Sequence, residues 1–137
     1  MKQGCLFCNI ANGMMESATI FENSEFRVIL DKFPGAKGHA LIMPKEHIED
    51  IYDLDAETAG KLFALATIVA KSLKKILNCD GMNLLQNNGS IAGQTVFHFH
   101  LHLIPRYEND GLQFAWETKK FSDDELGAIA ADIKREL

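Results

Sequence analysis

The chain has 137 residues, 47% of them hydrophobic and 24% charged, so it is long enough to bury one core, and we expect a single domain over residues 1–137. Its formal net charge of −5 argues against nucleic acid as a partner, since a surface that binds it would be basic. The sequence has no run of 18 or more apolar residues, so we expect no membrane span and no membrane partner. The odd number of cysteines does not suggest a disulfide framework, and the N-terminus has no apolar leader, so we expect a cytoplasmic protein.

The first part of the chain predicts a short helix followed by three strands. The helix covers residues 5–11 and ends at Asn12-Gly13. Runs of β-branched and aromatic residues predict strands over 19–22, 26–30 and 39–43, the last of which is stopped by Pro44. The segment between the second and third strands is rich in proline and glycine, and is predicted to be a loop.

One long helix is predicted next, with Asp55 as its N-cap and Asp80-Gly81 beyond its end. Lysines near its C-terminus are favoured by the helix dipole. The apolar residues that recur at helical spacing are Leu62, Leu65, Ala66, Val69, Leu73, Ile76 and Leu77. This helix is the clearest element of the sequence.

The remainder predicts a strand over 82–86, a loop over 87–93, a long strand rich in histidine, and a last helix opened by a capping box at Ser122–Glu125. Because the strands cluster between two helical blocks, we expect an α+β fold with a mostly antiparallel sheet of about five strands. One long helix, a short N-terminal helix and a C-terminal helix complete the prediction.

Three of the five histidines stand at alternate positions of the predicted long strand, at His98, His100 and His102. On an extended strand they form one row with roughly 6–7 Å between neighbours. The opposite face would carry Phe97, Phe99, Leu101 and Leu103. Each buried imidazole nitrogen needs a partner, so such a row is costly and indicates chemistry.

Three interpretations of the row are open from the residues alone. The histidines could be half-buried strand residues without a chemical role, although strict spacing of three makes this the least favoured. A His-x-His pair could bind a catalytic zinc together with another ligand. An imidazole could also act as a nucleophile toward phosphorus and later leave, which divides one displacement into two easier steps.

The loop before the row favours a phosphate substrate. Asn87-Asn88-Gly89-Ser90 and Gly93-Gln94-Thr95 offer amides, a hydroxyl and backbone N–H groups with little bulk. The alternative is a flexible connection between two strands. Because the loop lies directly before the histidines, a phosphate-binding loop and a simple connection are about equally plausible.

Three blocks of the chain resemble the histidine triad (HIT) family. The run from Gly93 to Ile104 resembles its signature, His-φ-His-φ-His-φ-φ with φ apolar, after Gly-Gln-Ser/Thr-Val. The stretch from Ile29 to Ile48, with Asp31 and Gly38-His39, resembles a second block, and Asn87 with Gly89-Ser90 resembles a third. The C-terminal tail resembles the bacterial branch.

The resemblance implies a nucleotide hydrolase or transferase that acts at the α-phosphate of purine nucleotides through a covalent nucleotidyl-histidine. It implies that His100 is the nucleophile, that His102 supports the charge on the phosphate, and that His39 assists in proton transfer. If the pKa of a free imidazole held for the nucleophile, activity would fall below about pH 6.5.

The substrate-binding residues also come from the resemblance. It implies phosphate contacts from Gln94, Thr95, Asn87 and the Gly93 backbone, and ribose contacts from Asp31. Candidates for the base pocket are Phe7, Ile10, Ile29 and Leu41, although a core position is about as plausible for each.

Cys5-Leu6-Phe7-Cys8 has the spacing of a zinc knuckle, which alone is weak evidence and also fits a redox pair. In bacterial relatives such a pair is completed by two histidines, and the matching positions are His47 and His98. The resemblance therefore implies a structural Zn²⁺, while Cys79 is predicted to be a packing residue.

The resemblance also implies a homodimer, with the helix around Leu62–Leu77 and a sheet edge as contacts. Two other functions remain open: a non-catalytic nucleotide-binding or scaffolding protein, and a zinc-dependent hydrolase. The leaving group decides between a nucleoside phosphoramidase and a dinucleoside polyphosphate hydrolase.

Overall fold

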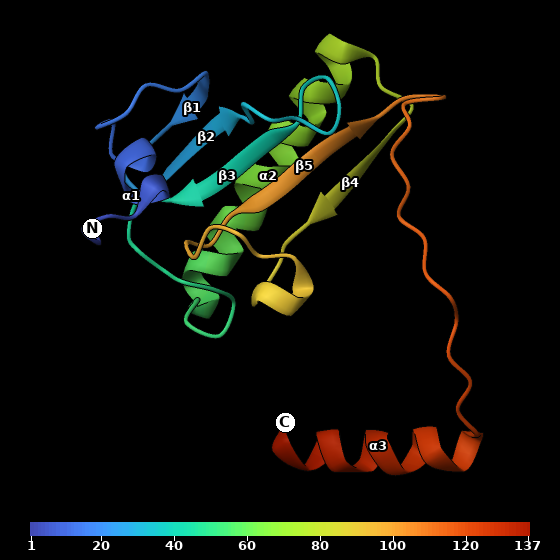
Figure 1. Ribbon diagram of the computed structural model, residues 1–137. Helices are drawn as coiled ribbons and strands as arrows, with labels where there is room; N and C mark the ends of the chain where they lie inside the picture. Colours follow the sequence, from blue (N-terminus) through green and yellow to red (C-terminus); the bar gives the residue numbers. More distant parts are fainter.

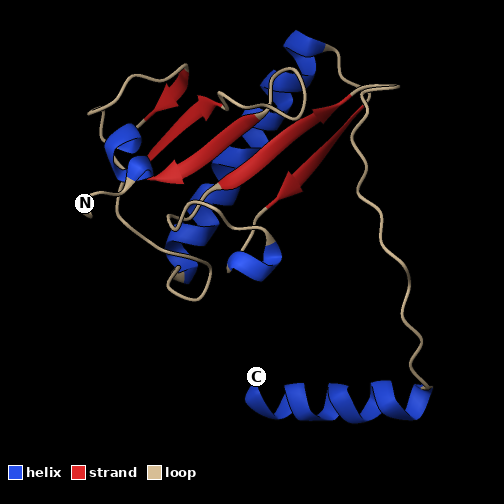
Figure 2. Cartoon of the chain, in the orientation of Figure 1, coloured by secondary structure: helices blue, strands red, loops and turns tan.

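The computed structural model describes residues 1–137 as one five-stranded sheet with helices on its two faces (Figures 1 and 2). All paired strands are antiparallel, and their order across the sheet is β1-β2-β3-β5-β4. The strands are β1 (Thr19–Glu22), β2 (Phe26–Leu30), β3 (Ala40–Pro44), β4 (Gly81–Leu85) and β5 (Leu101–Arg106). The expected α+β architecture is confirmed.

The helix α2 (Ala56–Leu77) crosses one face of the sheet and supplies the main core (Figure 1). Asp55 caps it as predicted, because its carboxylate accepts the backbone N–H of Thr58. The face that it buries is made of Leu62, Leu65, Ala66, Val69 and Leu73, whereas Ile76 is exposed. The helical spacing therefore identified every buried residue of α2 and added one exposed residue, Ile76.

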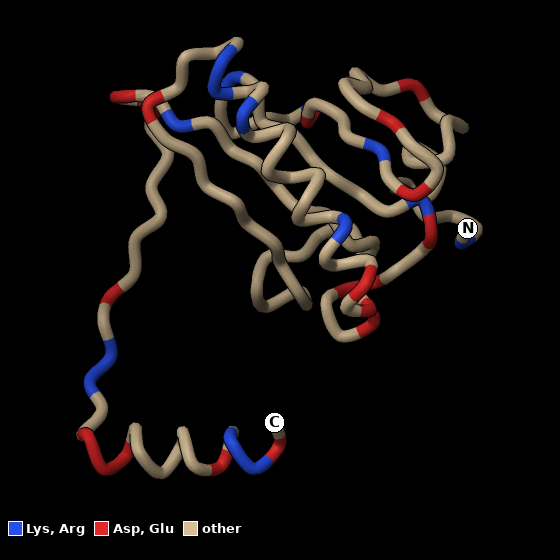
Figure 3. The backbone as a smooth tube through the Cα atoms, turned by 180° about the vertical axis from the view of Figure 1, so that it is seen from behind, with Lys and Arg blue, Asp and Glu red and all other residues tan.

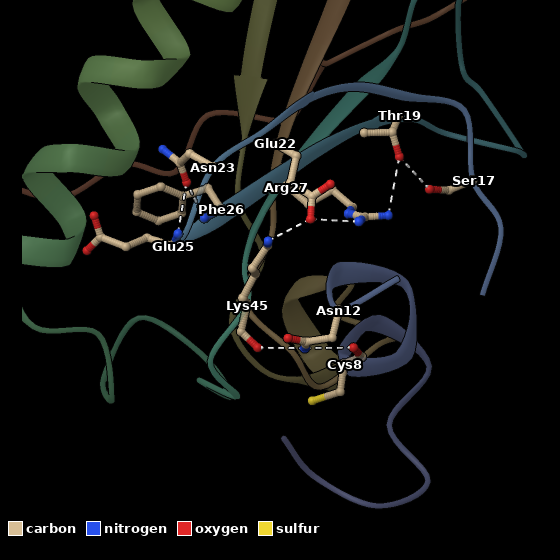
Figure 4. A network of polar contacts seen from close by, with 10 residues as sticks. All are labelled: Cys8, Asn12, Ser17, Thr19, Glu22, Asn23, Glu25, Phe26, Arg27 and Lys45. Carbon is tan, nitrogen blue, oxygen red and sulfur yellow. Dashed lines mark hydrogen bonds and ion pairs between the residues drawn. The ribbon is translucent and has the colours of Figure 1, made fainter. Parts of the chain in front are cut away.

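The short helix α1 (Leu6–Ala11) covers the other face, where a smaller core forms from Phe7, Ala11, Ile29, Leu41 and Met43. Its C-terminal end is tied to the end of β3 by Asn12. The Asn12 amide donates to the carbonyl of Cys8 at 2.9 Å and to that of Lys45 at 3.0 Å (Figure 4). This bridge fixes α1 over the sheet near the histidines.

The histidine strand is shorter than predicted, because β5 begins only at Leu101. Residues before it form a connection that includes the short 3₁₀ helix η1 (Ser90–Ala92). Phe99, Leu101 and Leu103 are buried in the main core as predicted, but Phe97 is 40% exposed, which corrects its assignment to the buried face. The regular alternation holds only where β5 pairs with its neighbours.

The positive φ of Gly38 favours glycine in the loop before β3. Gly38 has φ +85°, which side-chain-bearing residues rarely adopt, and a Cβ at this position would lie 2.1 Å from Leu77 Cδ1. The Leu77 methyl could rotate away, so the backbone conformation is the main reason for glycine here. Gly38 thus allows the loop that carries His39 to lie against α2.

The C-terminal helix α3 (Asp123–Glu136) forms with the predicted capping box but does not join the core. It lies away from the sheet at the end of an extended segment (Figures 1 and 3), and every residue from 113 to 137 is exposed. No helix in the structure combines the length and apolar character needed to cross a bilayer.

Replacing Leu103 by Ala is expected to lower the free energy of unfolding by about 2–5 kcal/mol, since this fully buried side chain would leave a cavity. The matched change Ile91→Ala, at a fully exposed position, should cost less than about 0.5 kcal/mol. Urea titrations of both variants would measure the difference. Equal losses would contradict the assignment of Leu103 to the core.

Candidate active site

The hydrogen bonds of His100 determine which of its nitrogens is free to react. Its Nδ1 lies 2.7 Å from the carbonyl oxygen of His98, which can only accept, so Nδ1 carries the proton. The neutral ring therefore has its lone pair on Nε2. The side chain is 7% exposed, so this unprotonated nitrogen is largely shielded from water.

A second chain of hydrogen bonds sets the tautomer of His102. The backbone N–H of Gly35 donates to Nδ1 of His39 at 3.0 Å, so neutral His39 carries its proton on Nε2. That nitrogen donates to Nδ1 of His102 at 2.9 Å. The remaining nitrogen of His102, Nε2, must then carry a proton and can donate to an anionic oxygen.

Two aromatic rings pack against the imidazole of His100. The Phe7 ring meets it edge to face, with the centroids 4.8 Å apart, and the centroid of His102 lies at 4.9 Å. Asp31 completes the group, because its Oδ2 lies 3.7 Å from Nε2 of His39 while its Oδ1 accepts the N–H of Phe33. The lone pair of His100, the donor of His102 and the carboxylate of Asp31 belong to one region.

Burial lowers the pKa of all three site histidines, because a charged ring is poorly solvated there. It lowers the pKa of His102 to about 4, with nearby His100 and His39 adding to the effect. Burial is also the main cause of the lowered pKa of His100 and His39. The pKa of His100, the predicted nucleophile, therefore lies below that of a free imidazole.

Acid is expected to destabilise the protein below about pH 6.5, where a histidine of the unfolded chain starts to bind protons. In the fold the pKa of His102 is about 4, so the unfolded state binds more protons between these values and stability falls as the pH drops through this window. Turnover should persist below about pH 6.5, because burial lowers the pKa of His100 and His39 and keeps both rings neutral there. Urea midpoints over this pH range test the loss of stability, and kcat over the same range tests the persistence of turnover. A fall of kcat with a midpoint at about pH 6.5 would contradict the expected turnover.

The loop before β5 is braced mainly by Gln94, which is 3% exposed. Its amide accepts the N–H of Gly89 at 2.8 Å and donates to the carbonyls of Glu49 and Val96. This predicted phosphate ligand therefore has its side-chain atoms engaged within the protein. Its contact with phosphate stays a prediction.

The other loop residues are arranged around a left-handed glycine. Gly93 has φ +91°, and a Cβ there would lie 3.6 Å from the amide nitrogen of Asn87, so the two predicted phosphate ligands are neighbours. Thr95 is exposed and shares a shallow pocket with His47 and residues 2–6. The structure thus brings Asn87 and Gly93 together and places Thr95 toward the N-terminal segment.

A separate cluster contains Cys5, Cys8, His47 and His98, whose ligand atoms all lie within 4.8 Å of one another. His98 Nε2 lies 2.8 Å from the carbonyl of Pro44, which leaves its Nδ1 as a lone pair facing both sulfurs. The observed N···S separations are 3.6, 3.3 and 3.5 Å. Tetrahedral zinc with its usual bond lengths separates sulfur and nitrogen ligands by about 3.6 Å, so the set fits a Cys₂His₂ metal.

The histidine row divides into separate groups. His98 belongs to the cysteine cluster, while His102 belongs with Asp31 and His39, and no group of possible ligands includes two members of the row. The expectation that neighbouring histidines of the row hold one catalytic metal is therefore not supported. The cause is the hydrogen bonds of His98 and His100, which point their free nitrogens into different regions.

Some of the groups that organise the site carry no signal in the sequence. Gly35 and Pro44 act through a backbone N–H and a carbonyl, for which any residue type can serve. Phe7 was singled out only for a base pocket, yet it packs on His100. Only its place beside Cys8 on α1 could have indicated this contact.

The chain is similar along nearly its whole length to known proteins. A profile of the HIT domain matches residues 12–109. Protein hit of Bacillus subtilis is 36% identical over 98% of this chain and 95% of its own length. Adenosine 5'-monophosphoramidase HNT1 of Saccharomyces cerevisiae is 38% identical over 97% of this chain and 82% of its own.

Solved structures give the same result. A HIT family protein from Bacillus anthracis is 40% identical, with a TM-score of 0.94 over 100% of this chain and 99% of that one. A Streptococcus mutans protein is 36% identical, with a TM-score of 0.95 over 99% of this chain and 87% of that one. A Zn-bound histidine triad family protein from Mycobacterium smegmatis is 35% identical, with a TM-score of 0.76 over 98% of each chain.

The antiparallel sheet, with its histidines grouped beside a glycine-rich loop, defines a protein of the histidine triad class. The chain belongs to the HIT domain family.

Proposed function

We propose that this protein is a hydrolase that cleaves a nucleoside phosphoramidate or dinucleoside polyphosphate at the α-phosphate and releases a nucleoside monophosphate. The observation that carries the proposal is the pair of opposite tautomers at the site. His100 presents a lone pair on Nε2, and His102 presents an N–H on its own Nε2. A nucleophile and an anion donor side by side suit phosphoryl chemistry.

The reaction proceeds in two displacements. His100 Nε2 forms a bond to the α-phosphorus as the bond to the leaving group breaks, and the leaving amine or phosphate takes up a proton, with His39 and His102 as the nearest proton carriers. Water then attacks the same phosphorus. The N–P bond breaks, the lone pair returns to His100, and the monophosphate leaves with one proton released.

The remaining substrate contacts follow from the positions of the predicted residues. Asp31 offers two acceptor oxygens for the two ribose hydroxyls. Phe7 and Ile10 of α1 pack with Ile29 and Leu41 of the sheet, and this apolar group is assigned to the side of a purine base. The left-handed turn at Gly93 with Asn87, together with Thr95 and Gln94, forms the phosphate side.

A Zn²⁺ ion held by Cys5, Cys8, His47 and His98 has a structural role in this proposal. The set is closed, with four protein ligands and no open position, which is typical of structural zinc. Thiolate ligands need a reducing compartment, which supports the cytoplasm as the location. The Zn-bound relative supports the choice of metal.

We also propose that the protein works as a homodimer. Strand β4 is an edge of the sheet with Leu84 exposed on it, and α2 exposes the apolar side chains of Phe63, Ile68 and Ile76. An unpaired sheet edge and exposed apolar side chains support an interface.

Detection of the covalent intermediate tests the function. Adenosine 5'-phosphoramidate is mixed with the protein and quenched within milliseconds at alkaline pH, since the phosphoramidate bond is labile in acid. Mass spectrometry should find an adenylyl group on the peptide that contains His100. Turnover without this adduct would exclude the nucleophile, and nucleotide binding without any turnover across a substrate panel would instead indicate a non-catalytic binding protein.

A further inference from the structure

Cys5 and Cys8 are placed so that they can be joined to each other as well as to a metal. Cys5 is the N-cap of α1, and its Sγ accepts the backbone N–H of Cys8 at 3.4 Å. The two residues lie one helical turn apart, which is within the Cα separation of about 4.4–6.8 Å that a disulfide spans. Both sulfurs also belong to the group of ligand atoms within 4.8 Å of one another. A disulfide between them therefore requires only a small movement of the two side chains.

One of the two sulfurs can be reached from solvent. Cys8 is fully buried, whereas Cys5 is only partly buried. Cys5 also lines a cavity of about 330 Å³ together with residues 2–4, His47 and Thr95. A cavity of this size admits a small peroxide, whose dimensions are close to those of water. Because oxidation of cysteine follows exposure, Cys5 is the sulfur that an oxidant meets first.

Two connections join this pair of cysteines to His100. Phe7 lies between Cys5 and Cys8 in the sequence, and its ring packs edge to face on the imidazole of His100 with the centroids 4.8 Å apart. His98 directs its Nδ1 at both sulfurs, while its backbone carbonyl accepts the N–H of His100 Nδ1 at 2.7 Å. The residues around the cluster therefore also hold the packing and the tautomer of His100.

The ring of His47 depends on the reduced cluster for its one polar contact. Its Nδ1 lies 3.3 Å from Cys8 Sγ, and its Nε2 is buried without a hydrogen-bond partner. The thiolate is the form of cysteine that binds metal, so a disulfide would leave both nitrogens of His47 without a partner. His98 differs, because its Nε2 keeps the carbonyl of Pro44 at 2.8 Å. Loss of the thiolates therefore frees the segment after β3 from α1.

From these contacts we propose that Cys5 and Cys8 form a redox switch, in which oxidation to a disulfide releases the metal and lowers turnover through Phe7 and His98. The inference rests on the structural zinc proposed above. Formation of the disulfide is independent of the chemistry at His100.

The oxidant that we propose is a hydroperoxide, and hydrogen peroxide is the simplest case. The Sγ of Cys5 attacks one peroxide oxygen, the O–O bond breaks, and the departing hydroxide takes up a proton to become water. The Sγ of Cys8 then attacks the sulfur of the Cys5 sulfenic acid, the S–O bond breaks, and a second hydroxide becomes water in the same way. Two electrons pass from the sulfurs to the peroxide oxygens. The site thereby loses both thiolate ligands and its affinity for Zn²⁺.

Oxidation would loosen only one end of α1. The Asn12 amide still donates to the carbonyls of Cys8 and Lys45, which ties the C-terminal end of the helix to the end of β3 (Figure 4). Ala11 stays in the smaller core beneath it. The N-terminal end, which carries Phe7, is then the part that moves. A change confined to one end of a helix is reversible on reduction, because the rest of the fold is kept.

Titration of the reduced, zinc-loaded protein with hydrogen peroxide tests the switch. We expect one zinc per chain to be released, as measured with a chromogenic chelator, in step with a Cys5–Cys8 disulfide found by peptide mapping. Turnover of adenosine 5'-phosphoramidate should fall at least about tenfold, because the surroundings of His100 are disturbed. Dithiothreitol followed by Zn²⁺ should restore it.

Two variants serve as controls. Cys5→His keeps four possible metal ligands but cannot close a disulfide, so it should hold zinc and keep it in peroxide. Cys79→Ser removes the remaining cysteine, which lies outside the cluster, and should respond as the wild type does.

Four results would each overturn the switch: reduced protein that holds no zinc, oxidation that leaves the zinc bound, Cys5→His protein that loses zinc as the wild type does, or full turnover after oxidation. Peptide mapping and zinc release are measured without substrate. A wild type that is inactive before oxidation would therefore reject the proposed function, while these two measurements would still decide whether the pair responds to peroxide.

Discussion

The substitution His100→Ala is expected to reduce turnover by about 10⁴-fold or more, because it removes the group that forms the bond to phosphorus in the proposed mechanism. Binding of a nucleoside monophosphate should change only a few-fold. The ring is 7% exposed and its Nδ1 is engaged by the His98 carbonyl, so only one edge of it can face a ligand. Single-turnover kinetics and calorimetry with the product measure the two effects.

The control for this experiment is His102→Asn, which keeps an N–H donor near the phosphate but loses the hydrogen bond from His39. We expect a smaller loss of about 10- to 10³-fold, with the adduct on His100 still formed. If His100→Ala keeps more than about one per cent of wild-type turnover, the nucleophile has been assigned to the wrong residue.

The substitution Cys8→Ser is expected to have the largest effect on stability, about 4 kcal/mol or more, since it removes a ligand from the Cys₂His₂ set. Cys79→Ser is the matched control, because Cys79 is also buried but lies outside the cluster. It should cost only about 1–3 kcal/mol, the cost of burying a hydroxyl. Calorimetry together with metal analysis by mass spectrometry measures both.

Equal losses in the two cysteine variants would indicate that no metal binds at this cluster. In Cys8→Ser we further expect α1 to loosen, and with it Phe7, whose ring packs on His100. Turnover should then fall in proportion to the fraction of molecules with α1 in place. Metal-free protein that keeps this helix ordered and yet is inactive would point instead to a zinc-dependent hydrolase.

The sequence by itself determined the elements whose pattern is local. Helical spacing and Asp55 predicted α2, Ser122 and Glu125 predicted the start of α3, and alternation predicted the core positions of β5. The residues of both clusters came from the resemblance to the HIT family, since the Cys-x-x-Cys pair and the histidine row alone left other interpretations open. Hydrophobic periodicity and motif spacing are properties of neighbouring residues, which is why they could be identified without coordinates.

Only the tertiary structure decided the tautomer and the surroundings of each histidine. The tautomers depend on Gly35, on Pro44 and on the backbone of His98, groups that are distant in sequence or carry no side-chain signal. The lowered pKa of His102 depends on burial, which no local pattern measures. Phe97 is exposed because it precedes the first residue of β5, where strand pairing begins. The apolar residues of α3 are also exposed, because this helix does not pack on the core of its own chain.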